Sequence, residues 1–222
     1  MLTIYTFIFS EVFQSRWAGG TGSRLEFAEM LFAGLTVYGL FAECLTRAPS
    51  LIVGNVNFVK KVVFPIEILP WIALCASLFH AAMSLAALLL FSLLIHHSLP
   101  WSVFLFPIVL SPLILLTMGL SWILASLGVF IRDIAQTVGI AVSVLLFLSP
   151  IFYPVTSLPK SIQPLWNLNP LTFIIEQARL VLISGKAPDW IGLSIYALIS
   201  FCVAWAGLWW FQRTRRAFAD VL

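Results

Sequence analysis

The fold of this chain is decided by residues 68–131, which read ILPWIALCASLFHAAMSLAALLLFSLLIHHSLPWSVFLFPIVLSPLILLTMGLSWILASLGVFI. No Asp, Glu, Lys or Arg occurs in this stretch, which lies between Glu67 and Arg132. A bilayer core about 30 Å thick is crossed by roughly 20 helical residues, so the stretch is too long for one crossing. It is interrupted at residues 96–100, HHSLP, and we therefore predict a helical hairpin with spans near 66–95 and 103–131.

The composition of the whole chain agrees with a location in lipid. Of its 222 residues, 61% are hydrophobic and 9% are charged, and the mean hydropathy is +1.05. Soluble domains carry about 25% charged residues, which cover a surface wetted by water. The 12 basic and 9 acidic residues of this chain cannot provide such a cover, which excludes a soluble enzyme, a nucleic-acid-binding protein and a disordered chain. We expect an all-α polytopic membrane protein that forms a single transmembrane domain over residues 1–222.

Three further spans flank the hairpin. Uncharged or nearly uncharged stretches predict spans near 134–153, 191–211 and 28–47. Within the last of these, Glu43 precedes Arg47 by four residues, so the two side chains can pair across one helical turn.

The first segment is anomalous, because Glu11 and Arg16 follow the apolar run Leu2–Phe9 almost at once. Sixteen helical residues reach only about 24 Å, which is short of the hydrocarbon thickness. No positively charged region precedes the run, which argues against a signal peptide. Residues 1–17 are either a short interfacial segment or part of an incomplete first span, and we favour a six-span protein that is truncated at its N-terminus.

Basic residues in the short loops predict the orientation in the membrane. Seven of them belong to one face: Arg47, Lys60, Lys61, Arg132, Arg213, Arg215 and Arg216. Five belong to the other face: Arg16, Arg24, Lys160, Arg179 and Lys186. Because cytoplasmic loops carry the excess of Lys and Arg, we expect the C-terminus to lie in the cytoplasm.

Signatures of catalysis are missing from the sequence. No phosphate-binding loop, HExxH, CxxC or GxSxG motif occurs, so we expect no catalytic, cofactor or metal site. Cys44, Cys75 and Cys202 are expected to be buried thiols rather than disulfide or metal partners. At mid-depth the last four spans carry one ionisable residue, His80, which is either a proton relay or a neutral histidine bonded to a neighbouring helix. The energy for any uphill transport must therefore come from a partner.

A polar segment at 49–65 follows the span near 28–47. Its apolar residues fall at helical spacing, which predicts an amphipathic helix on the cytoplasmic face. This helix is either a passive interfacial element or a docking surface for a cytoplasmic protein. The polar residues for docking are Asn55, Asn57, Lys60 and Lys61.

A second polar segment, 154–190, is too long for a plain connection and is expected to be external. It contains five prolines, and an amphipathic helix over 171–183 follows Asn169 and Pro170. Glu176 and Arg179 share one face of this helix, where we expect an ion pair worth well under 1 kcal/mol if exposed. Two short helices that re-enter the outer leaflet would account for its length and apolar content.

Several motifs resemble the type-2 ABC exporter permeases, and within them the branch that exports O-antigen, capsule or teichoic-acid chains. The most specific block comprises SPIFYPV at 149–155, LP at 158–159, LNPLTFIIEQAR at 168–179 and GKAPDW at 185–190. KKVVFPIEILP at 60–70 and RDIAQ at 132–136 also match this branch. The resemblance covers nearly the whole chain. The sequence departs from the family pattern at its start, where the first span is incomplete.

The resemblance implies a homodimer of six-span subunits in the bacterial inner membrane, with two copies of a separate cytoplasmic ABC ATPase and no cofactor. ATP-driven motion would enter through the loop 49–65, and the external helices, with Asn169, Pro170, Glu176 and Arg179, would gate the exit for a lipid-linked polysaccharide. Two other interpretations stay open: a type-2 permease for a drug or small lipid, and a membrane scaffold without transport activity.

Aromatic rings stack on the C–H faces of sugars, so a channel for polysaccharide would be lined partly by aromatic residues. The candidates are Phe7, Phe13, Phe152, Tyr153, Trp166 and Phe173. For each of them, a lipid-facing or interhelical packing role is an equal alternative.

Overall fold

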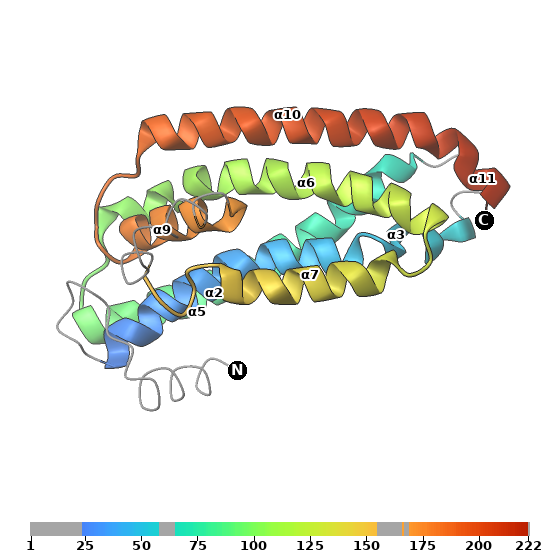
Figure 1. Ribbon diagram of the computed structural model, residues 1–222. Coiled ribbons are helices and arrows are strands. Elements are labelled where there is room, and N and C mark those ends of the chain that lie inside the picture. Colours follow the sequence, from blue (N-terminus) through green and yellow to red (C-terminus); the bar gives the residue numbers. More distant parts are fainter. Residues whose placement is uncertain (1–23, 58–64, 155–165, 167–168, 222) are drawn as a thin grey trace. The chain divides into compact units, whose positions relative to one another are not determined.

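The computed structural model describes residues 24–57, 65–154, 166 and 169–221, and the described part of the chain contains helices and no strands (Figure 1). The expected all-α membrane fold is therefore confirmed. The elements are α2 (Arg24–Arg47), α3 (Ser50–Val53), η2 (Ile66–Ile68), α5 (Leu69–His96), η3 (Trp101–Leu105), α6 (Phe106–Phe130), α7 (Ile134–Leu148), α9 (Pro170–Leu182), α10 (Trp190–Thr214), η5 (Arg215–Ala217) and α11 (Phe218–Val221).

Within the described residues, four helical segments are long and apolar enough to cross a membrane. They cover Leu25–Arg47, Ile66–His96, Trp101–Phe130 and Trp190–Ala217. α7 is apolar but shorter, and it ends at Leu148, before the end of the predicted span near 134–153. Pro150 accounts for this end, because a proline disfavours the helical conformation in the residue before it. The count of six spans stays a prediction, since residues 1–17 lie outside the described part.

The turn of the predicted hairpin is built by local backbone chemistry. α5 ends at His96, and His97 adopts a left-handed conformation with φ of 54°. Pro100 is extended, and the 3-10 helix η3 then leads into α6. Residues 96–100 thus end one long helix and start the next, as the sequence indicates.

The chain forms two compact units, and α2, α5, α6 and α7 each contribute residues to both. The first unit comprises Met1–Tyr38, Ala81–Leu110 and Leu145–Asp189. Its α9 is deeply buried, with Leu171, Ile174, Ile175, Ala178 and Val181 fully enclosed. Ser102 donates a 2.6 Å hydrogen bond to the carbonyl oxygen of Val181, which ties η3 to α9.

A buried carboxylate connects α2 and α5 within the first unit. Glu29 is fully buried, and its Oε2 lies 3.0 Å from Nε2 of the half-exposed His96. A buried polar group is costly unless it is bonded, so this contact favours one register between the two helices.

The second unit comprises Gly39–His80, Ser111–Val144 and Trp190–Leu222. Its core is a cluster of large apolar side chains from several helices, which includes Ile52, Leu74, Met118, Trp122, Phe211 and Phe218. Trp122 Nε1 donates to the carbonyl oxygen of Glu67, and the Glu67 carboxylate pairs with Arg215. The C-terminal helices are thereby anchored to the start of α5.

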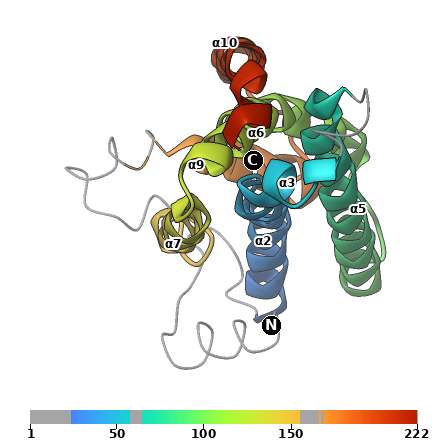
Figure 2. The ribbon, with the colours of Figure 1, turned by 90° about the vertical axis from the view of Figure 1, so that its right-hand side faces the viewer.

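Two glycines allow α6 and α10 to approach closely inside this second unit. A Cβ atom on Gly207 would lie 2.9 Å from the Cα of Gly119, and one on Gly119 would lie 2.7 Å from the Cα of Ala204. Both views show the two helices side by side (Figures 1 and 2). Lipid provides no hydrophobic driving force for the association of membrane helices. Small residues allow the two backbones to approach closely, and the resulting van der Waals packing stabilises the contact.

Candidate coupling surface and gate segment

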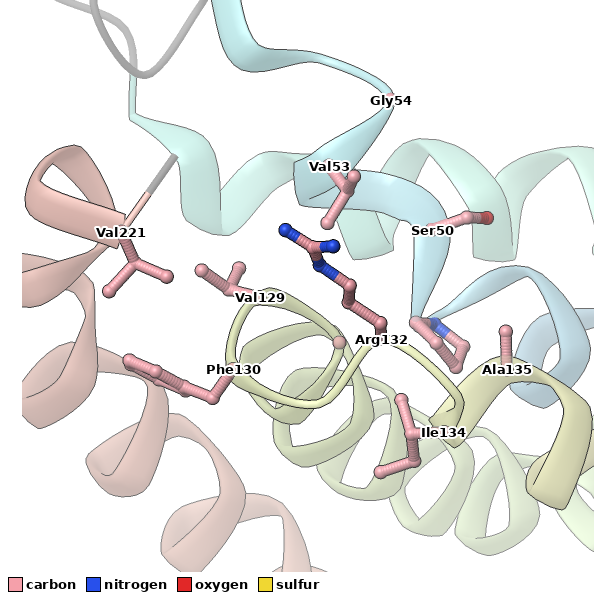
Figure 3. Close-up of a pocket in the computed structure, with 11 residues that line it drawn as sticks. Ser50, Val53, Gly54, Val129, Phe130, Arg132, Ile134, Ala135 and Val221 are labelled. Carbon is pink, nitrogen blue, oxygen red and sulfur yellow. The ribbon is translucent and has the colours of Figure 1, made fainter.

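A cavity of about 770 Å³ in the second unit lies where three connections meet. One wall is the chain that follows α2, another is the turn between α6 and α7, and α11 contributes Val221 (Figure 3). The lining residues are Pro49, Ser50, Val53, Gly54, Gly128, Val129, Phe130, Arg132, Ile134, Ala135 and Val221. We call these residues the coupling surface.

Gly128 is essential to the geometry of the coupling surface. A Cβ atom on Gly128 would lie 2.7 Å from the carbonyl carbon and 2.8 Å from the Cα of Pro49. Real Cβ atoms do not approach a backbone so closely, so any other residue at position 128 must displace the segment at Pro49. The loop after α2 therefore packs directly against the end of α6.

The loop itself differs from the continuous amphipathic helix expected over 49–65. α3 covers Ser50–Val53, residues 54–55 form a turn, and Val56 and Asn57 are helical again. The side-chain amide of Asn55 donates a 2.8 Å hydrogen bond to the carbonyl oxygen of Leu51. Such side-chain bonds to the backbone compete with helix propagation. Gly54 has the lowest helix propensity apart from proline, which also favours a break here.

The four predicted docking residues fall into two groups. Asn55 is half-buried by its bond to Leu51, and Asn57 is exposed. Lys60 and Lys61 lie outside the described residues. Their role in docking stays a prediction.

Arg132 was not among the predicted docking residues, yet the structure places it in the coupling surface. Its side chain is exposed and extends into the cavity towards Val53 (Figure 3). A signal for it exists in the sequence, because Arg132 is the one basic residue between Lys61 and Lys160. An isolated cation in a turn between two apolar helices indicates a place where the chain meets water or a polar partner.

The part of the predicted gate segment that forms α9 belongs to the first unit, and the start of this helix is set by local hydrogen bonds. Asn169 Oδ1 accepts a 2.9 Å hydrogen bond from the backbone N–H of Leu171, and Pro170 occupies the first helical turn. Asn at the N-cap followed by Pro is a favoured helix start. The side-chain amide of Asn169 also donates a 3.0 Å hydrogen bond to Ser149 Oγ, and this bond connects α9 to the segment after α7.

The end of α9 is equally well determined by sequence. The helix ends at Leu182, and Gly185 has φ of +69°, a left-handed conformation that other residues rarely adopt. Lys186 N–H donates to the carbonyl oxygen of Leu180. The predicted helix over 171–183 is thus confirmed to within a residue at each end.

Arg179 has a different role from the expected exposed pairing with Glu176. Its side chain is buried, and its guanidinium donates to three backbone carbonyls: Met30 at 3.0 Å, Pro150 at 2.6 Å and Ile151 at 2.9 Å. Glu176 is exposed and acts on Arg179 through its charge. Sequence spacing missed this role because the three carbonyls lie far away along the chain.

The electrostatics of Arg179 follow from this burial. Desolvation lowers the pKa of the guanidinium to about 9, and the carboxylate of Glu176 raises it. Arg179 is therefore positively charged at neutral pH. A buried cation of this kind is stabilised by the three carbonyl dipoles that surround it.

The aromatic candidates are partly connected by hydrogen bonds. Trp166 Nε1 donates a 2.8 Å hydrogen bond to the Tyr153 hydroxyl, which in turn donates a 2.8 Å hydrogen bond to the carbonyl oxygen of Phe147. Burial raises the pKa of Tyr153, so this hydroxyl keeps its proton. Phe152 is buried with its ring centre 5.9 Å from that of Phe147, and Phe173 is half-buried. Phe7 and Phe13 lie outside the described residues.

In the part of the chain that the structure describes, no group of three or more His, Cys, Asp or Glu side chains is arranged to hold a metal ion. The three cysteines are free: Cys44 is buried as expected, whereas Cys75 and Cys202 are exposed on the surface of the single chain. The two exposed thiols lie in α5 and α10, which are long apolar helices.

Comparison with known protein families identifies the family of this chain. The profile of the ABC-2 type transporter family matches residues 1–183. The chain belongs to the ABC-2 type transporter family. It is a multi-pass membrane protein of a family of transport subunits that are not themselves the ATPase.

Individual ABC-2 relatives resemble the chain over most of its length. It is 26% identical over 196 residues to the O-antigen export system permease protein RfbA of Myxococcus xanthus, which covers 87% of this chain and 75% of that protein. An O-antigen export system permease protein RfbA of Klebsiella pneumoniae is 25% identical over 86% of this chain and 74% of its own length. A second such protein of K. pneumoniae is 24% identical over 99% of this chain and 82% of its own length.

The ABC-2 match includes both sites described above. The coupling surface, apart from Val221, and the gate segment through Arg179 lie within the matched residues 1–183. The recognition of a type-2 ABC exporter permease from its sequence motifs is therefore confirmed.

Proposed function

We propose that this chain is the membrane-spanning subunit of an ATP-driven exporter that moves a lipid-linked, O-antigen-like polysaccharide across the inner membrane. The observation that carries this proposal is the similarity to three O-antigen export permeases over 86–99% of the chain. Their identity of 24–26% leaves the sugar composition of the substrate open.

The energy for export enters from outside the chain in this proposal. Two copies of a separate ABC ATPase dock at the coupling surface of a permease homodimer, with the C-terminus of each permease in the cytoplasm. The exposed Arg132 and Asn57 are polar groups that a cytoplasmic protein can bind, and the cavity of about 770 Å³ is large enough to accept side chains of the partner.

The gate segment lies on the external side in this proposal. α9 is held to the turn after α7 by Arg179 and Asn169, so a movement of α7 is transmitted directly to α9. The hydrogen-bonded rings of Tyr153 and Trp166 lie beside this connection and are candidates for stacking on sugar faces.

A deletion strain tests the proposal. Loss of the gene should remove the polysaccharide from the cell surface and trap lipid-linked polymer inside, and a plasmid copy should restore export. Normal surface glycan in the deletion strain would refute the proposal. Internal accumulation of a drug or small lipid in place of glycan would favour the alternative type-2 permease.

A further inference from the structure

Three polar side chains form a connected group on α2 and α5 within the second unit, and we call them the polar cluster. His80 Nδ1 lies 2.9 Å and 3.0 Å from the two carboxylate oxygens of Glu43. Glu43 Oε1 lies 2.7 Å from Nη2 of Arg47. The expected pair of Glu43 with Arg47 and the expected bond of His80 to a neighbouring helix are thus both present.

The polar cluster reaches the middle of a membrane-spanning helix. The apolar segment that contains His80 runs from Ile66 to His96, so its midpoint is Ala81, the next residue. The His80 side chain is 58% exposed on the surface of the single chain, and that of Glu43 is 22% exposed. Phe79, the residue before His80, is also exposed but apolar.

Such a position is unfavourable in contact with lipid. Ionisable side chains in membrane helices are costly in hydrocarbon, and they face the interior of a bundle or a water-filled cavity. Arg47 lies in the last turn of α2 with its guanidinium paired to Glu43, whereas His80 lies at least 14 residues from either end of its apolar segment Ile66–His96. The surface around His80 and Glu43 therefore faces something polar in the assembled protein.

The chemistry of the polar cluster suits hydroxyl groups. The bond to the Glu43 carboxylate requires a proton on Nδ1 of His80, and the second ring nitrogen, Nε2, can form a hydrogen bond with a hydroxyl group. The Glu43 carboxylate has further lone pairs for hydroxyl donors, and Arg47 supplies N–H donors. Gly39, one turn before Glu43 on the same face of α2, has no atom within 4 Å of the position of a Cβ, so there is room beside the carboxylate.

We propose that the polar cluster lines a water-filled path through the membrane and binds the hydroxyl groups of a carbohydrate chain in transit. This inference rests on the proposed function, since it specifies where the exported sugar chain is contacted. Neutral hydroxyls bonded one at a time hold a moving chain weakly, which suits a path that must release each sugar unit.

Water access to position 80 is the first test. Cys44, Cys75 and Cys202 are replaced by Ala in the full exporter with its ATPase, and His80→Cys is treated in cells with a charged methanethiosulfonate reagent. Phe79→Cys is the matched control, because Phe79 is equally exposed on the same helix but points about 100° away. We expect the thiol of His80→Cys to react at least about tenfold faster than that of Phe79→Cys, since a thiolate forms in water and not in lipid.

Polymer in the path should shield this position. The reaction rate of His80→Cys should fall in cells that make the polysaccharide, relative to cells that cannot make it. Equal rates in both strains would exclude carbohydrate as the occupant. Oxidative cross-linking between the introduced thiols of two neighbouring His80→Cys copies would instead place this face at an interface between permeases and overturn the proposal.

Substitutions in the otherwise unchanged chain give a second test that does not depend on the cysteine-free background. His80→Leu removes every hydrogen-bonding group at position 80 and should lower the export rate about tenfold, the effect of one lost hydrogen bond. His80→Gln keeps polar groups there and should export faster than His80→Leu. Both variants should reach the membrane in normal amounts. Equal export by His80→Leu and the parent would contradict a binding role.

The outcomes separate this inference from the proposed function. If the deletion strain loses surface glycan but position 80 is unreactive, the chain is the exporter and the polar cluster is not in its path. If position 80 is water-accessible but the deletion strain has normal glycan, the path exists and carries another substrate, which overturns the carbohydrate assignment.

Discussion

The guanidinium of Arg179 donates a 2.6 Å hydrogen bond to the carbonyl oxygen of Pro150, which lies 29 residues earlier in the chain. With the further bonds to Ile151 and Met30, one side chain joins α9, the turn after α7 and the start of α2 inside the first unit. Arginine suits this position because its planar group presents five donors in fixed directions, which a lysine cannot reproduce.

Arg179→Gln should therefore destabilise the permease strongly. At least two buried carbonyls would lose their donors, and each unsatisfied buried group costs about 1–3 kcal/mol. The expected result is a clearly lower unfolding temperature in detergent and loss of surface glycan. Glu176→Gln is the matched control on the same helix, because Glu176 is exposed and its charge effect on Arg179 is small in water. Equal unfolding temperatures for Arg179→Gln and Glu176→Gln would contradict the structural role of Arg179.

Asn169 performs two separable tasks, and two substitutions distinguish them. Asn169→Asp keeps the oxygen that caps Leu171 but loses the amide that donates to Ser149, whereas Asn169→Ala loses both. Loss of an N-cap costs about 1 kcal/mol, so Asn169→Ala should be less stable than Asn169→Asp. Chemical or thermal unfolding in detergent measures the order. A more stable Asn169→Ala variant would contradict a stabilising cap by the side chain of residue 169.

The contact between Gly128 and Pro49 predicts a coupling defect. Gly128→Ala places a Cβ against the backbone of Pro49 and must displace the loop that carries α3. We expect the variant to insert into the membrane but to export poorly, with ATP hydrolysis by the partner no longer stimulated by substrate. Gly139→Ala on α7 is the control, because no atom lies within 4 Å of its Cβ position. Parent-like export by Gly128→Ala would show that this loop tolerates displacement.

Arg132 should contribute to the affinity for the ATPase rather than to folding. It is exposed and extends into the cavity, so Arg132→Glu leaves the core intact while it reverses the charge at the coupling surface. Co-purification of the tagged permease with its ATPase should fall, with unchanged thermal stability. Arg213→Glu, a charge reversal at another exposed site outside the lining of this cavity, is the matched control. An equal effect of both reversals would indicate a general charge effect on association.

Several elements of this protein could be predicted from sequence because they depend on local chemistry. The hairpin break at residues 96–100, the Asn169 cap with Pro170, the left-handed Gly185 and the Glu43–Arg47 pair all follow from neighbours a few residues apart. The apolar composition alone determined the all-α membrane class, because lipid leaves few other ways to satisfy a spanning backbone.

The features that sequence reasoning missed depend on contacts between distant segments. The spacing of three residues along α9 predicted Glu176 as the partner of Arg179. The carbonyl of Met30, which Arg179 binds, lies 149 residues away and could not be found from spacing. The close approach of Gly128 to Pro49 at the coupling surface likewise joins segments that lie far apart along the chain. The break in the expected helix after Val53 could have been predicted, because Gly54 and Asn55 both disfavour helix continuation.

Reconstituted transport tests the central claim most directly. The chain and its partner ATPase are incorporated together into proteoliposomes that contain a fluorescent lipid-linked polysaccharide, and an impermeant glycosidase reports which side the sugar faces. Polysaccharide should change sides when ATP is added and both subunits are present, and should stay in place without ATP or with Arg179→Gln. No ATP-dependent movement by an assembled complex that hydrolyses ATP would contradict the assignment of this chain as a polysaccharide exporter subunit.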